Sequence, residues 1–308
     1  MSRENHALVY LKLILTTLFW GGTWVAAHVL VQEVPPFTGA FVRFSIAVAA
    51  LAWVVWRHEG GWPRLNRSNA MTLFWLGFTG IFLYSYCFLT GLKYITAGRG
   101  ALVIAFNPIL VALVAWLGYK ERMTWLKGMG IVLALVGCVL VISNGHPERL
   151  LQGEIGLGEL LILGCVVSWT AYTFIGRRAT QSLSPLVTTF YASVVGMVLL
   201  GVAAIGEAPW QLIPHFSLTA WMCLLYLGIF GTATAYTWFT DSVKVIGAAR
   251  TAPFINLVPL SGVLFSALIL GERLHIMVLL GGLVTVVGVM MTVWAGHGSS
   301  QPHLKRVK

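Results

Sequence analysis

Long blocks of apolar residues, separated by short polar breaks, dominate this sequence. A transmembrane helix needs about 20 consecutive apolar residues to cross the ~30 Å hydrocarbon core of a bilayer. Because every backbone polar group in lipid must find an internal partner, blocks of this length predict helices. Ten blocks qualify: Leu8–Val31, Pro36–Trp56, Asn69–Gly91, Thr96–Leu117, Met123–Ser143, Ile155–Gly176, Pro185–Gly206, Ser217–Phe239, Gly247–Leu270 and Leu274–Ala295. The expected fold is an all-α membrane protein with ten transmembrane helices.

The charge pattern argues against a soluble nucleic-acid-binding protein. Only 10% of the 308 residues are charged, and the net charge is +10. In a soluble protein this excess of positive charge would favour nucleic-acid binding. Here Lys and Arg gather in alternate loops, which is the positive-inside pattern of membrane proteins. We therefore expect a lipid bilayer and no nucleic acid as partner, with both termini in the cytoplasm.

The chain also contains an internal repeat, with an offset equal to the 151 residues between Glu121 and Glu272. At this offset polar and special residues align in pairs: Lys93 with Lys244, Arg99 with Arg250, Pro108 with Pro259, and Glu121-Arg122 with Glu272-Arg273. Since each unit holds five spans, an odd number, the second must enter the membrane in the opposite sense. We expect inverted-topology repeats at residues 8–143 and 155–295, then a basic cytoplasmic tail at 296–308.

Inverted repeats are typical of alternating-access transporters, which bind a small molecule near the midplane between the halves. The sequence therefore predicts a transporter. An intramembrane enzyme or lipid-handling protein that uses the same cavity is the alternative. The sequence holds no Walker A, GxSxG or HExxH motif, and Cys87, Cys138, Cys165 and Cys223 lie inside apolar blocks. We expect no enzymatic activity, no cofactor and no metal.

Aromatic residues inside the spans are the main candidates for substrate binding. Trp20 and Trp169 occupy equivalent places in the first helix of each half. An aromatic cavity with few polar groups suits an amphipathic or cationic solute. Packing within the core is the alternative for any one of these residues. The predicted substrate-binding set is Trp20, Trp24, Tyr84, Asn107, Trp169, Tyr172, Tyr236 and Asn256.

Prolines and charges inside the spans form a second group of candidates. Pro108 and Pro259 should break the fourth and ninth helices, either to open a cavity or to shape a kink. Charges inside a bilayer are costly and usually functional, and the chain places no carboxylate in the middle of a span. The intramembrane charges are Arg43, Glu159, Arg99 and Arg250. We expect Arg43 to bind substrate or to pair with Glu159, and the other two arginines to reach the headgroups.

Small residues line the fifth and tenth spans. Gly130 and Gly137 in the first half, and Gly281, Gly282 and Gly288 in the second, allow close helix contact. These faces could pack within one chain or between two. Both a monomer and a homodimer therefore remain open.

From about Leu8 to Ala295 the sequence resembles the drug/metabolite transporter superfamily, specifically its EamA-type ten-helix exporters. The residues that carry the resemblance are Phe19-Trp20-Gly21, Arg43-Phe44, Pro108 and Glu121-Arg122, then Ser168-Trp169, Gly247-Ala248, Asn256, Pro259 and Gly271-Glu272-Arg273-Leu274. The resemblance implies a multi-pass exporter of the cell inner membrane. It implies amino acids, related metabolites or toxic organic cations as substrates, and a central cavity between the two halves.

Overall fold

The computed structural model is a bundle of helices, and it describes residues 6–59, 65–119, 124–143, 145–148, 156–246, 251, 254–255 and 257–297. Within these ranges there is no strand. The helical elements, in chain order, are α1 (His6–Leu30), α2 (Pro36–Glu59), α3 (Arg67–Leu76), η1 (Gly77–Leu83), α4 (Tyr84–Gly91), α5 (Ala97–Ile104), α6 (Asn107–Tyr119), α7 (Trp125–Ile142), α9 (Leu157–Ala179), α10 (Pro185–Ala204), η2 (Ile205–Glu207), α11 (Pro209–Leu212), η3 (Ile213–His215), α12 (Leu218–Leu225), η4 (Tyr226–Thr234), α13 (Ala235–Ile246), α15 (Leu257–Leu270) and α16 (Ile276–His297).

The all-helical, multi-pass character predicted from the sequence is confirmed. Seven helical segments of the described chain are long and apolar enough to cross a membrane: Ala7–Leu30, Pro36–Glu59, Arg67–Gly91, Ala97–Gly118, Leu157–Gly176, Pro185–Glu207 and Leu218–Val243. Three shorter apolar helices, Trp125–Val141, Leu257–Leu270 and Ile276–Thr292, lie in the fifth, ninth and tenth apolar blocks. Ten membrane crossings stay a prediction, because these three fall short in length.

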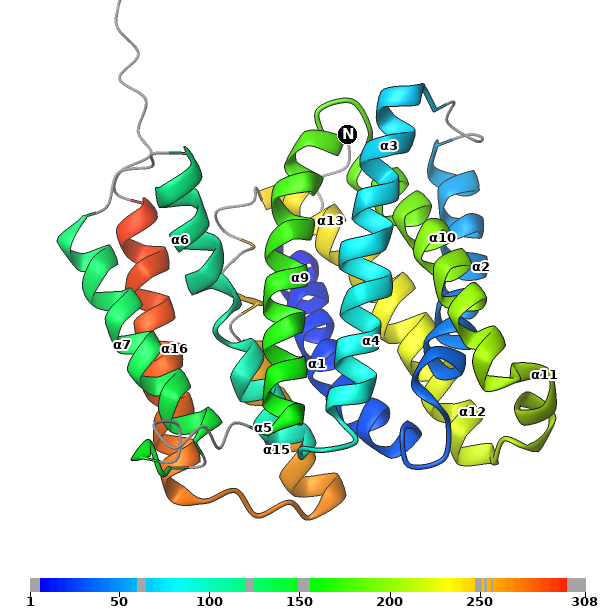
Figure 1. The fold of residues 1–308 in the computed structure, drawn as a ribbon. Coiled ribbons are helices and arrows are strands. Elements are labelled where there is room, and N and C mark those ends of the chain that lie inside the picture. The colour runs from blue at the N-terminus through cyan, green and yellow to red at the C-terminus, as the bar shows by residue number, and fades with distance from the viewer. Residues whose placement is uncertain are drawn as a thin grey trace, which may run out of the picture.

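Helices α7 and α16, which are equivalent in the repeat, pack against each other through glycines at one side of the bundle (Figure 1). A Cβ at Gly130 would lie 2.6 Å from the Gly288 carbonyl oxygen, and one at Gly137 would lie 2.5 Å from the Gly281 carbonyl oxygen. Residue numbers rise along one helix as they fall along the other, so the two helices are antiparallel. The glycine faces are thus used within one chain.

The second helices of the two halves, α2 and α10, are also antiparallel and are joined at both ends. Glu207, just after α10, accepts hydrogen bonds from the backbone N–H groups of Phe37 (3.2 Å) and Thr38 (2.6 Å) at the start of α2. Glu59, the last residue of α2, accepts one from the hydroxyl of Ser184 (2.6 Å), the N-cap of α10. A carboxylate satisfies the free N–H groups of a helix start and complements its dipole.

Two helices contain π-helical segments at equivalent positions. At the 151-residue offset, η1 (Gly77–Leu83) aligns with Gly228–Thr234, which lies within η4. π-Helical turns are rare and are often found at functional sites. Each segment runs directly into a helix that begins beside a predicted site tyrosine, Tyr84 in α4 and Tyr236 in α13. Nothing in the hydropathy pattern predicts these segments.

The fourth apolar block is interrupted near its proline. Helix α5 ends at Ile104, a turn occupies Ala105 and Phe106, and α6 begins at Asn107. Pro108 is thus the second residue of a new helix, where its missing N–H leaves no bond unmade. Pro259, buried, is the third residue of α15. A helix therefore begins one or two residues before each proline.

Candidate functional site

Trp20, near the middle of α1, is anchored by the π-helical segment η4. Its indole Nε1–H donates a hydrogen bond to the Gly231 carbonyl oxygen at 3.1 Å. Its ring centroid lies 5.6 Å from that of Tyr236 in an edge-to-face contact. A Cβ at Gly231 would lie 2.6 Å from the Thr23 side chain, so glycine is needed for this close approach of α1. An aromatic pair therefore joins the first half of the chain to the second.

A second aromatic pair also joins the two halves, with the tryptophan now in the second half and the tyrosine in the first. The ring of Trp169, in α9, lies 6.0 Å from that of Tyr84 and 5.4 Å from that of Tyr172. The Tyr172 ring packs directly on Gly80 of η1, where any Cβ would overlap it. Trp169 and Tyr172 come from the second half, whereas Tyr84 and Gly80 come from the first. Each half thus contributes aromatic rings to both groups.

Arg43, about two turns into α2, is buried near one tyrosine of each aromatic pair. Its side chain is within electrostatic range of both Tyr84 and Tyr236. Its Nη2 donates a long hydrogen bond of 3.4 Å to the hydroxyl oxygen of Thr232, and that hydroxyl donates in turn to the Leu227 carbonyl oxygen at 2.9 Å. Nε is buried and donates to no acceptor. A guanidinium with an unused donor therefore lies where both halves meet.

The expected pairing of Arg43 with Glu159 is wrong. Glu159 instead forms a 2.9 Å ion pair with Arg99. Glu159 is the third residue of α9 and Arg99 the third of α5, so both lie one turn or less from a helix start, whereas Arg43 lies deeper. The Nε of Arg99 also donates to the Val141 carbonyl oxygen at 3.3 Å, so this guanidinium is held by protein rather than by headgroups.

Trp24 is linked to Tyr84 through Phe88, whose ring centroid lies 5.9 Å from that of Tyr84. Trp24 is 3% exposed and packs edge-on against Phe88, with ring centroids 4.9 Å apart. A Cβ at Gly100 would lie 2.8 Å from the Trp24 ring, so this side chain wedges α1 against α5. Asn107 starts α6, and its Oδ1 is buried without a hydrogen bond. Asn256 and Arg250 lie outside the described residues.

Helices α5, α9 and α12 begin at the lower edge of Figure 1. Four glutamates at or beside helix ends bind groups of the opposite half, and we call this end of the bundle the glutamate end. Glu207 and Glu159 make the contacts described above. Glu272 accepts hydrogen bonds from the backbone N–H groups of Ala97 (2.9 Å) and Gly98 (3.0 Å) at the start of α5. Glu33 accepts bonds from the backbone N–H and the hydroxyl of Ser217, both at 2.6 Å. The Ser217 hydroxyl bond, followed by the backbone bond, lowers the pKa of Glu33.

Sequence reasoning missed Glu33 and Glu207 as contacts between the halves. A usable signal was present, because Ser217 and Pro36 are typical first residues of helices and leave backbone N–H groups free. Which carboxylate satisfies those groups depends on the tertiary arrangement. In each of the four contacts the glutamate and its partner come from different halves.

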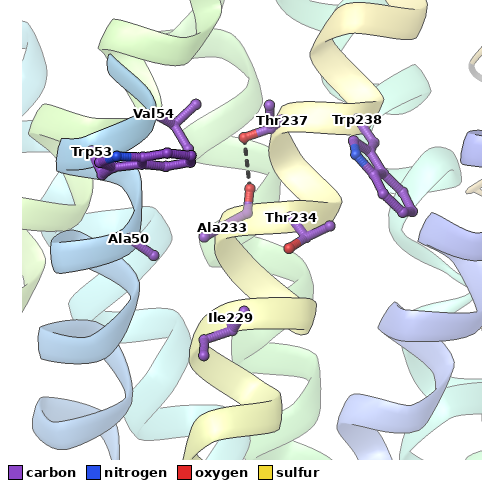
Figure 2. Close-up of a pocket in the computed structure, with 8 residues that line it drawn as sticks. All are labelled: Ala50, Trp53, Val54, Ile229, Ala233, Thr234, Thr237 and Trp238. Carbon is purple, nitrogen blue, oxygen red and sulfur yellow. Dashed lines mark hydrogen bonds between the residues drawn. The ribbon is translucent and has the colours of Figure 1, made fainter. Parts of the chain in front are cut away.

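A hollow of about 250 Å³ lies between α2 and the η4–α13 helix (Figure 2), and its lining includes no residue of the aromatic pairs. Its lining residues are Ala50, Trp53, Val54, Ile229, Ala233, Thr234, Thr237 and Trp238. Trp53 is 65% exposed, which places this hollow at the outer surface of the bundle. The Thr237 hydroxyl donates to the Ala233 carbonyl oxygen at 2.7 Å, so it offers little to a polar solute.

Comparison with known proteins agrees with a membrane-transport architecture. The model of the EamA-like transporter family matches residues 7–143 and again residues 156–294. The uncharacterized transporter YyaM of Bacillus subtilis (strain 168) is 31% identical over 286 residues, covering 93% of this chain and 93% of its own. An uncharacterized transporter of Archaeoglobus fulgidus is 29% identical over 305 residues, covering 96% of this chain and 100% of its own.

The fold also has a counterpart among solved structures. One crystal structure superposes on 97% of this chain and on 100% of its own, with a TM-score of 0.64 and 19% identity. At that identity the likeness shows a shared fold.

Proposed function

Since the chain belongs to the EamA-like transporter family, we propose that it moves a small organic solute across a membrane by alternating access. The solute binds between the halves, against the aromatic pairs Trp20–Tyr236 and Tyr84–Trp169 around Arg43. The single observation that carries this proposal is that each of the two tryptophans packs against a tyrosine of the other half. It makes the site common to both halves, as alternating access requires.

Inverted topology of the two five-helix units is part of the proposal. It is supported by the antiparallel packing of two sets of equivalent helices, α7 with α16 and α2 with α10. Rocking of one unit against the other would open the site first to one side and then to the other. Pro108 and Pro259 lie in the first turn of α6 and α15, and the π-helical segments interrupt the α-helical hydrogen-bond pattern, so these places are the proposed flexing points.

The charge pattern suggests which way the protein faces. Lys and Arg in alternate loops favour both termini in the cytoplasm, and the glutamate end then faces outward. The four contacts between the halves hold this end closed. The proposed activity is export across the cell inner membrane of amino acids, related metabolites or organic cations, by a monomer or a homodimer.

Reconstitution of the purified protein into proteoliposomes tests the proposal. Uptake and efflux of labelled aromatic amino acids, aliphatic amino acids and organic cations would be measured with and without a pH gradient. We expect protein-dependent flux of one class. Absence of protein-dependent flux for every class would contradict the proposal.

Two tryptophan variants test the site itself. Trp20→Ala and Trp169→Ala should each slow flux by roughly fivefold, because each removes an aromatic contact worth about 1 kcal/mol. Trp125→Ala is the matched control, since that side chain is 84% exposed. Normal flux in both site variants would remove these residues from the site.

A further inference from the structure

Arg43 is a buried cation whose hydrogen bonds are incompletely used. It is 8% exposed, and its Nε donates to nothing. Its bond to Thr232 is long at 3.4 Å. A guanidinium carries five N–H donors in a planar fork, and burial without partners is unfavourable for any of them.

No carboxylate in the described part of the chain forms an ion pair with Arg43. Among the side chains that the structure describes, Glu159 is paired with Arg99, and the ionisable groups that act on Arg43 are Tyr84 and Tyr236. Tyrosines are neutral near pH 7. The sequence reinforces this point, since no Asp or Glu occupies the middle of any apolar block. A buried charge without a counter-charge is costly in a membrane protein and usually has a function.

We propose that Arg43 binds a carboxylate of the transported solute, so that the site selects monoanionic or carboxylate-bearing solutes over organic cations. The assignment rests on the proposed transport function and narrows its substrate class. The solute carboxylate supplies the counter-charge for Arg43. Its apolar part packs between the Trp20–Tyr236 and Tyr84–Trp169 pairs.

The geometry of the arginine fits this role. Nε and the adjacent terminal nitrogen present parallel N–H groups that match the two oxygens of a carboxylate. Thr232 holds the terminal nitrogen, and the Thr232 hydroxyl proton is already used in its bond to Leu227. The hydroxyl oxygen therefore acts as acceptor and leaves Nε directed at the solute. Backbone packing reinforces this placement, because a Cβ at Gly228 would lie 2.9 Å from the Arg43 carbonyl oxygen.

Charge balance separates a carboxylate from other ligands. One guanidinium and one carboxylate leave the site neutral, which favours burial in a low-dielectric interior. A phosphate dianion would leave an uncompensated negative charge, and an organic cation would add a second positive charge beside Arg43. Binding of a phosphate dianion or of an organic cation beside Arg43 is therefore disfavoured.

A series of matched probes tests the inference on the unmodified protein in detergent. The probes are 3-phenylpropionate, its neutral amide, 3-phenylpropylamine and 3-phenylpropylphosphonate, and binding is measured by titration calorimetry. We expect the carboxylate to bind about 10- to 100-fold more tightly than the amide, the factor typical of a charge-assisted hydrogen bond. Equal or tighter binding of the amine or the phosphonate would overturn the inference, as would no binding of the carboxylate.

Variants of Arg43 test whether this side chain causes the preference for carboxylates. Arg43→Gln should bring carboxylate and amide affinities within about threefold of each other. Arg43→Lys should keep part of the preference, because it retains charge but loses the fork. Arg57→Gln is the matched control, an exposed arginine on the same helix. An unchanged carboxylate preference in a folded Arg43→Gln protein would refute the assignment.

Failure of this inference can be told apart from failure of the transport proposal. Protein-dependent flux of an organic cation that is unaffected by Arg43→Gln would overturn the inference and leave transport standing. Carboxylate binding that depends on Arg43, without flux of any solute, would support the inference and contradict transport.

Discussion

Several single residues matter because they let a helix or an aromatic ring of one half lie close to the other half. Gly80 lets the Tyr172 ring lie on η1, and Gly231 lets α1 approach η4 while its carbonyl holds Trp20. The two glycines are equivalent at the repeat offset. Both therefore help to position aromatic side chains.

Replacement of Gly80 by alanine should displace Tyr172 and weaken the site. The added Cβ would overlap the Tyr172 ring, and overpacking of this kind costs about 1–3 kcal/mol. We expect a lower unfolding temperature and slower flux. Gly118→Ala is the matched control, because nothing lies within 4 Å of its Cβ position and alanine is the better helix former. Equal unfolding temperatures and equal flux in the Gly80→Ala and Gly118→Ala proteins would show that the position of Tyr172 does not depend on its contact with Gly80.

At the scale of helices, the start of α5 is a junction of three elements. Arg99, in the first turn of α5, pairs with Glu159 of α9 and donates to the Val141 carbonyl oxygen of α7. Glu272 accepts hydrogen bonds from the free backbone N–H groups at the start of α5. A salt bridge with one well-buried partner depends on both residues, since removal of one leaves the other unpaired. The junction therefore couples α5, α7 and α9 at the glutamate end.

A double-mutant cycle should detect this ion pair. Arg99→Gln and Glu159→Gln should each lower the free energy of unfolding, and the double variant should lose less than the sum. We expect a coupling energy of about 1–3 kcal/mol, the range for residues in direct contact. The Arg43–Glu159 combination is the control and should be additive. Coupling in the control but not in the 99–159 pair would contradict the observed pairing.

At the scale of the whole molecule, the two halves meet through two kinds of contact. Aromatic pairs around Arg43 form the interior of the interface, and glutamates that bind helix starts or Arg99 close one end of it. Hydrogen bonds at exposed helix starts, such as that of Glu33 with Ser217, can be remade with water at small net cost. The glutamate end is therefore suited to open and close.

A reversible cross-link between the halves should stop transport. Glu33→Cys with Ser217→Cys replaces a hydrogen-bonded contact at the glutamate end by a disulfide. Flux should fall to background after oxidation and recover after reduction. The control is Asn66→Cys with Asn69→Cys, a contact at the start of α3 within one half, which should leave flux unchanged. Full flux through the oxidised 33–217 protein would contradict rocking at this end.

The sequence by itself determined the helical, membrane-spanning character, the family and the residues that are equivalent in the repeat. These follow from local patterns, since hydropathy is a property of one helix at a time and the offset compares residues along one chain. It also identified Trp20, Tyr84, Trp169, Tyr172 and Tyr236 as a set, because aromatic residues at mid-span are visible without coordinates.

Only the tertiary structure decided which of these residues meet. The bond between Trp20 and Gly231 joins positions 211 residues apart, and it depends on how η4 packs against α1. The π-helical segments have no hydropathy signature, since one extra residue per turn changes hydrogen bonds rather than composition. Glu159 pairs with Arg99 instead of Arg43 because depth in the bundle depends on where each helix begins. Packing between distant segments sets these distances, and a local pattern does not contain them.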